Sequence, residues 1–187
     1  MLQSSFSMID QLMVGQFGST AVSAVEVAGR PSFVYCVVLG AVATIAGIMI
    51  SQYLGMEDRK MAARSLWVNL VAATALALLL GALCFLFPDQ IVGLYIKDDP
   101  SVLAAGQNYL TCILWAYLPM GLSSTLAVMI RCLGRAVWPL VCGILSAIVN
   151  TGLNYALIFG HFGFPVFGVT GAAIASVVSQ LVNLMMI

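Results

Sequence analysis

The chain has 187 residues, of which 62% are hydrophobic and only 7% are charged. Soluble domains carry about 25% charged residues, so this composition excludes a water-soluble surface and indicates an integral membrane protein whose main partner is the lipid bilayer. Seven basic and seven acidic side chains leave no net charge, which gives no indication of a nucleic-acid partner.

Apolar stretches long enough to span a membrane follow one another along the whole chain. A bilayer core about 30 Å thick requires roughly 20 helical residues. The N-terminal stretch 1–17 is short and polar for a span, and we interpret it as a helix without its first turns. Five clearer stretches lie near Phe33–Leu54, Leu66–Phe87, Val102–Ile130, Leu140–Phe159 and Val169–Ile187. The sequence therefore predicts an all-α membrane protein, a bundle of about six transmembrane helices in one domain, residues 1–187.

Basic residues are concentrated in alternate loops. The loop after the second span carries Arg59, Lys60 and Arg64, and the loop after the fourth carries Arg131 and Arg135. The remaining loops contain one basic residue or none. Because basic loops stay on the cytoplasmic side, this alternation predicts that both ends of the chain face the cytoplasm. Such a topology requires an even number of spans, which supports counting the stretch 1–17 as one.

Three of the predicted spans carry polar residues at helical spacing, so that each has a polar face. In the first span these are Gln3, Ser4, Ser7, Asp10 and Gln11; in the fifth, Ser146, Asn150 and Asn154; in the sixth, Ser176, Ser179, Gln180 and Asn183. One interpretation is hydrogen bonding between helices that merely holds the bundle together. The other is a shared polar lumen, which Ser7, Gln11 and Gln180 would help to line.

Asp10 is the only acidic residue well inside a span, and an intramembrane carboxylate is by default a functional hypothesis. The alternative is a hydrated Asp close to the outer surface. Asp10, Asn154 and Ser176 each lie near six residues from the outer end of their span, which corresponds to a depth of about 9 Å. With Asn150 they could form an oxygen-lined cation site. Burial also disfavours the ionised carboxylate, which makes Asp10 a candidate proton carrier.

Enzymatic motifs are absent from the sequence. It contains neither H-E-x-x-H nor G-x-S-x-G, and its five cysteines lack the C-x-x-C spacing of metal sites. We therefore expect no enzyme, no catalytic residues, and no metal other than a Na+ ion at Asp10. Glu26 and Arg30 lie four residues apart and are expected to pair on one helix face, with a lumen-facing Glu26 as the alternative.

Five segments resemble, in order and spacing, the multidrug and toxic compound extrusion (MATE) transporters. They are MIDQLMVGQFG at Met8–Gly18, ISQYLGMEDRKMAAR at Ile50–Arg64, MIRCLGRAVWPL at Met129–Leu140, NTGLNYALIFG at Asn150–Gly160 and FGVTGAAIASVVSQ at Phe167–Gln180. Each pattern is weak alone, whereas five in the right order are strong together. The resemblance implies one lobe of a fold with twelve helices in two six-helix lobes.

The resemblance also implies a function and a site. MATE proteins are secondary antiporters that expel organic, often cationic, compounds in exchange for Na+ or H+, and they need no other cofactor. By motif, the cation site of the N-terminal lobe maps to Asp10, Asn150, Asn154 and Ser176. Some members have an Asp at the position of Asn154. Asp10 is then the only carboxylate of the site, and the choice between Na+ and H+ stays open.

The chain departs from the family in length. It lacks the start of helix one and the whole second lobe, so we expect a partial chain completed by a missing C-terminal lobe or by a second copy. The resemblance places it in a bacterial inner membrane as a multi-pass protein with a small organic substrate. Two alternatives remain: a flippase for lipid-linked oligosaccharides from the same superfamily, and an inactive structural fragment.

Overall fold

Helices make up nearly all of the secondary structure in the computed structural model, which describes Gly15 and residues 19–94, 100–160 and 165–187. The helices of the described part are α2 (Ser19–Gly55), α3 (Arg59–Leu86), α4 (Pro88–Gly93), α5 (Pro100–Cys132), α6 (Val137–Phe159) and α7 (Val169–Met186). Five of these helices, all except α4, are long and apolar enough to cross a membrane. The prediction of an all-α membrane protein is therefore confirmed.

Each of the five clear apolar stretches coincides with a helix, and the predicted ends agree to within three residues except at two helix starts. Helix α3 begins at Arg59, seven residues before the predicted Leu66, and the larger difference is at α2. This helix begins at Ser19, well before the predicted start at Phe33. Within this added part of α2, Arg30 Nη2 pairs with Glu26 Oε1 at 3.3 Å, as the spacing predicted, which makes both charged residues compatible with the helix. Apart from Gly15, the predicted first span 1–17 lies outside the described residues.

Local signals explain where several helices begin and end. Pro88 and Pro100 are the first residues of α4 and α5, where a missing backbone N–H costs nothing. The Asp58 side chain caps α3 by accepting a hydrogen bond from the Met61 N–H at 3.0 Å. Gly160 ends α6 in the left-handed conformation, with φ at 70°, which glycine adopts without a side-chain clash. These residues thus mark helix boundaries.

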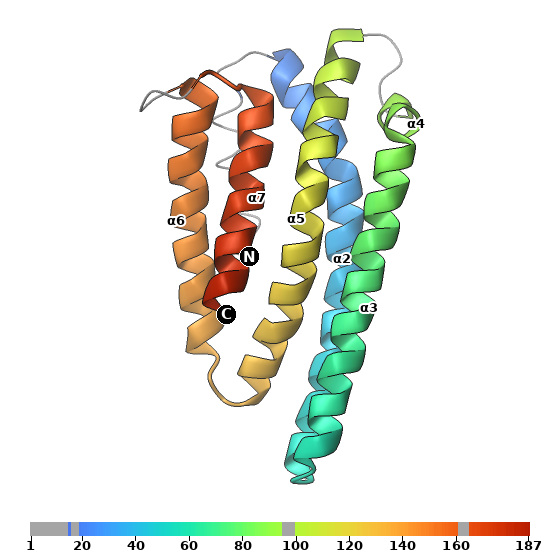
Figure 1. Cartoon of the computed structure of the whole chain (residues 1–187), viewed down its shortest axis with the longest axis vertical. Helices are drawn as coiled ribbons and strands as arrows, with labels where there is room; N and C mark the ends of the chain where they lie inside the picture. Colours follow the sequence, from blue (N-terminus) through green and yellow to red (C-terminus); the bar gives the residue numbers. More distant parts are fainter. Residues whose placement is uncertain (1–14, 16–18, 95–99, 161–164) are drawn as a thin grey trace.

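The central helix of the bundle is α5, which packs against α2, α3 and α7, while α6 packs mainly against α7 (Figure 1). The α2–α3 turn and the α5–α6 turn lie at one end of the bundle, and the start of α7 lies at the other (Figure 1). The two basic loops therefore share an end, which agrees with the alternation found in the sequence.

Small residues occupy the helix interfaces and large apolar residues face outward. Ala28, Ala46 and Ala173 are fully buried, whereas Phe33 and Trp67 are 70% and 68% exposed. Membrane helices associate in this way, because lipid solvates large apolar side chains and small residues let backbones approach. The outer surface of the bundle therefore suits contact with lipid.

A pair of stacked tyrosines joins α2 to α5. The rings of Tyr35 and Tyr117 are 4.5 Å apart and nearly parallel, and both side chains are buried. Tyr35 Oη donates to the Tyr117 carbonyl oxygen at 2.7 Å, and Tyr117 Oη lies 2.9 Å from Ser32 Oγ. Both phenol groups thus have partners inside the apolar interior, which fixes α2 against α5.

Candidate functional site

Helix α6 presents a row of polar side chains to α7. Ser146, Asn150 and Asn154 are four residues apart, so they lie on one face of the helix, and all three are buried. Asn154 has no exposed surface at all. A buried amide costs free energy unless it is hydrogen-bonded, so the partners of these side chains decide how the two helices fit together.

Hydrogen bonds join residues of this row to each other along α6 and join the row to α7. Asn154 Nδ2 donates to Asn150 Oδ1 at 3.2 Å. Asn150 Nδ2 in turn lies 3.4 Å from both Ser176 Oγ and Ser179 Oγ. Ser146 Oγ donates to the Ser179 carbonyl oxygen at 2.7 Å, and Ser179 Oγ donates to the Ser176 carbonyl oxygen at 2.9 Å. We call these five residues the α6–α7 polar chain.

Close approach of the two helices makes these bonds possible. Gly171, Ala172, Ala173 and Ala175 are all buried in α7. A Cβ atom at Gly171 would lie 2.9 Å from the carbonyl carbon and oxygen of Leu157, a distance that side-chain carbons do not tolerate. The α6 and α7 backbones therefore meet at a position that only glycine permits, and this contact sets the separation at which Asn150 reaches the serines.

The structure brings together three of the four residues predicted for the cation site. Asn150 contacts Ser176 and Asn154 directly, and Ser176 reaches Asn154 through Asn150. Asp10, Ser7 and Gln11 lie outside the described residues, so their positions remain predictions. Gln180 is half-buried on α7.

Ser146 and Ser179 belong to the polar chain but were not among the predicted site residues. Both are buried, and Ser179 is bonded to Asn150 as directly as Ser176 is. Their spacing in the sequence could have identified them, because Ser146 lies one turn before Asn150 and Ser179 one turn after Ser176. The polar faces of the two spans therefore identify the residues of the α6–α7 polar chain more completely than the family motif alone does.

The polar chain consists of neutral amides and hydroxyls. Within the described ranges, no three His, Cys, Asp or Glu side chains gather in a way that could hold a metal ion. Since Asn154 Nδ2 points toward Asn150, the amide oxygen of Asn154 lies on the opposite side of the group. Hard cations bind oxygen ligands and favour an anionic one among them. The α6–α7 polar chain offers the neutral ligands, and the predicted anionic ligand is Asp10.

Comparison with known proteins gives consistent matches over nearly the whole chain. The MatE family model matches residues 1–156. A probable multidrug resistance protein NorM from Thermotoga maritima is 32% identical over 183 residues, covering 97% of this chain and 39% of the relative. A protein of the same description from Agrobacterium fabrum is 32% identical, covering 90% of this chain and 36% of the relative.

Solved structures show the same fold. A MATE transporter in the bent conformation superposes with a TM-score of 0.88 at 19% identity, covering 99% of this chain and 40% of the other. The outward-facing conformation of a multidrug resistance MATE family transporter gives a TM-score of 0.86, also at 19% identity and with 40% of its length covered. The chain therefore spans about 40% of the length of the relatives it matches, as expected for one lobe of two.

Proposed function

Since the chain belongs to the MatE family, as its motifs predicted, we propose that it forms one lobe of an ion-coupled exporter of organic, often cationic, compounds. Two of its relatives are described as probable multidrug resistance proteins, which supports this class of substrate. The chain is a multi-pass membrane protein. We place it in a bacterial inner membrane with the α2–α3 and α5–α6 turns in the cytoplasm, where a second lobe or a second copy completes the transporter.

The coupling ion, Na+ or H+, binds at Asp10 beside the α6–α7 polar chain in this proposal. The observation that carries it is the burial of two amides, Asn150 and Asn154, in a helix that is long and apolar enough to cross a membrane. A serine hydroxyl alone could join α6 to α7, as Ser146 Oγ does when it donates to the Ser179 carbonyl oxygen. Two further amides bring oxygen atoms to the depth at which the sequence places Asp10.

Alternating access then follows from two states of Asp10. In one state the carboxylate holds the ion, and in the other it is free and the helices around it pack differently. An ion can shift this equilibrium only as far as its affinity for the two states differs. Asn150 and Asn154 contribute to that difference, because their amide orientations are fixed by bonds to each other and to α7.

Vesicles loaded with ethidium, a fluorescent organic cation, test the proposal. They contain the completed transporter, either as two copies of the chain or as the chain purified together with a C-terminal lobe. An imposed Na+ or pH gradient should drive ethidium efflux, and Asp10→Asn should abolish the dependence on the gradient. Glu26→Gln is the matched control, because it makes the same chemical change at an exposed carboxylate that pairs with Arg30. Gradient-driven efflux that persists in Asp10→Asn would refute the role of Asp10. Transport of a lipid-linked sugar without ethidium efflux would instead favour a flippase.

A further inference from the structure

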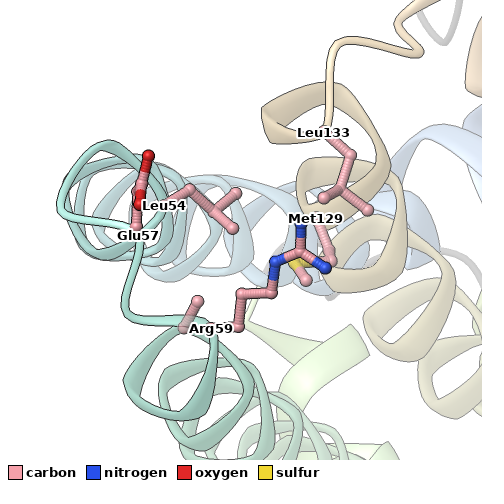
Figure 2. Close-up of a pocket in the computed structure, with 6 residues that line it drawn as sticks. Leu54, Glu57, Arg59, Met129 and Leu133 are labelled. Carbon is pink, nitrogen blue, oxygen red and sulfur yellow. The ribbon is translucent and has the colours of Figure 1, made fainter.

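A groove lies at the end of the bundle that carries the basic turns. Its volume is about 550 Å³, and it lies between the end of α2, the start of α3 and the end of α5 (Figure 2). The residues that line it are Leu54, Glu57, Arg59, Ala62, Met129 and Leu133. None of them belongs to α6 or α7, so the groove is separate from the polar chain.

Arg59 is the cationic side chain of this groove. Its guanidinium extends across the groove toward Met129 and Leu133, away from Glu57 (Figure 2). In the part of the chain that the structure describes, Arg30 and Glu26 form an ion pair, whereas Arg59 forms no ion pair. The adjacent Asp58 is engaged as the cap of α3. The guanidinium therefore lies against apolar walls with no anion from the described chain beside it.

The charge of the surroundings favours an anion. The two turns at this end of the bundle and the helix ends beside them carry five basic residues, Arg59, Lys60, Arg64, Arg131 and Arg135, against two acidic ones, Glu57 and Asp58. Such clusters at a membrane boundary attract phospholipid headgroups. The groove lies at this boundary, because Trp67 and Val68, two turns further along α3, are exposed apolar residues that suit the lipid-facing band.

We propose that the groove binds the headgroup of a phospholipid, with its phosphate on Arg59. A guanidinium binds phosphate oxygens through paired N–H donors, and the apolar walls suit the glycerol and the first methylenes of the acyl chains. The volume falls within the range of sites for small molecules. The proposal concerns a different surface from the ion site and does not depend on transport.

Glu57 gives the site a preference among headgroups. Its carboxylate lies on the far side of Leu54 from the guanidinium (Figure 2). A headgroup that reaches from Arg59 to Glu57 would meet an acceptor there. Ethanolamine and glycerol end in hydrogen-bond donors, whereas choline has no N–H or O–H. The groove should therefore select phosphatidylethanolamine and phosphatidylglycerol over phosphatidylcholine.

Native mass spectrometry of the purified chain tests this site by counting retained lipids at equal concentrations of the three phospholipids. We expect the first two to be retained at least about fivefold more than phosphatidylcholine. Arg59→Gln should reduce this retention about tenfold. Lys60→Gln is the matched control, since it removes the same charge one residue away, outside the lining of the groove. Leu133→Trp, which fills the groove from an exposed position, should act like Arg59→Gln.

Three results would overturn the proposal. Equal losses in Arg59→Gln and Lys60→Gln would show diffuse attraction of lipid to surface charge. Equal retention of phosphatidylcholine would remove the role of Glu57 and of the groove's shape. Displacement of the lipid by millimolar glycerol phosphate would indicate a site for a soluble phosphate compound in place of a lipid.

Discussion

Replacing Gly171 with Ala should separate α6 from α7. The added Cβ would lie 2.9 Å from the Leu157 carbonyl carbon and oxygen and 3.2 Å from the Ile158 nitrogen. These are backbone atoms, which cannot rotate away, so the helices must move apart by several tenths of an ångström. Overpacking of this kind costs about 1–3 kcal/mol.

The polar chain adds to that cost. Both bonds from Asn150 Nδ2 to the serines are already 3.4 Å long, so a small separation breaks them. Each hydrogen bond between membrane helices contributes about 0.6 kcal/mol. Together the two effects give a loss of about 2–4 kcal/mol of unfolding free energy.

Thermal unfolding of the chain in detergent, followed by circular dichroism, measures this loss. Gly152→Ala is the matched control, because a Cβ atom at Gly152 in α6 meets nothing within 4 Å. That substitution should leave stability unchanged or raise it by up to about 1 kcal/mol, since alanine favours a helix more than glycine does. Equal melting temperatures for Gly171→Ala and Gly152→Ala would refute the close contact of the two backbones.

Further predictions concern the tyrosine pair and the start of α3. Tyr35→Phe removes the bond to the Tyr117 carbonyl and should destabilise the chain by about 1 kcal/mol in the same assay. Gly121→Ala should cost more stability, because its Cβ would lie 2.7 Å from Tyr35 Oη. Tyr35→Phe should restore part of the stability that Gly121→Ala removes. Strict additivity of the two changes in unfolding free energy would contradict the contact. Asp58→Ala should lower stability by about 1 kcal/mol through loss of the α3 cap, whereas a melting temperature equal to that of the unmodified chain would show that the cap contributes nothing.

Much of the fold could be predicted from the sequence, because a membrane span is recognised from the length of one apolar run, without knowledge of the rest of the chain. The starts of α2 and α3 were misplaced because both helices begin with polar or charged residues, which a search for apolar runs leaves out of the span. The short helix α4 was missed as well, although Pro88 at its first position and Asp89 in its first turn are helix-start signals.

The candidate site was predictable where residue spacing fixes depth. Equal distances from the span ends placed Asn154 and Ser176 at one level, and the structure joins both to Asn150. Other features depend on how distant helices pack, which leaves no local pattern. The stacking of Tyr35 on Tyr117 and the groove around Arg59 are of this kind, since each combines side chains from helices far apart in the sequence.

Infrared difference spectroscopy of the carboxyl group of Asp10 tests the central claim most directly, because it detects the binding of either Na+ or H+ at this one side chain. Subtracting the Asp10→Asn spectrum isolates the signal as Na+ or pH is varied. The α6–α7 polar chain predicts that Asn154→Leu shifts the midpoint about tenfold in Na+ concentration or about one pH unit, which corresponds to about 1.4 kcal/mol. Asn69→Leu, which removes another buried amide on α3, should leave the midpoint unchanged. Identical midpoints in Asn154→Leu and the unmodified chain would contradict an ion site shared by Asp10 and the polar chain.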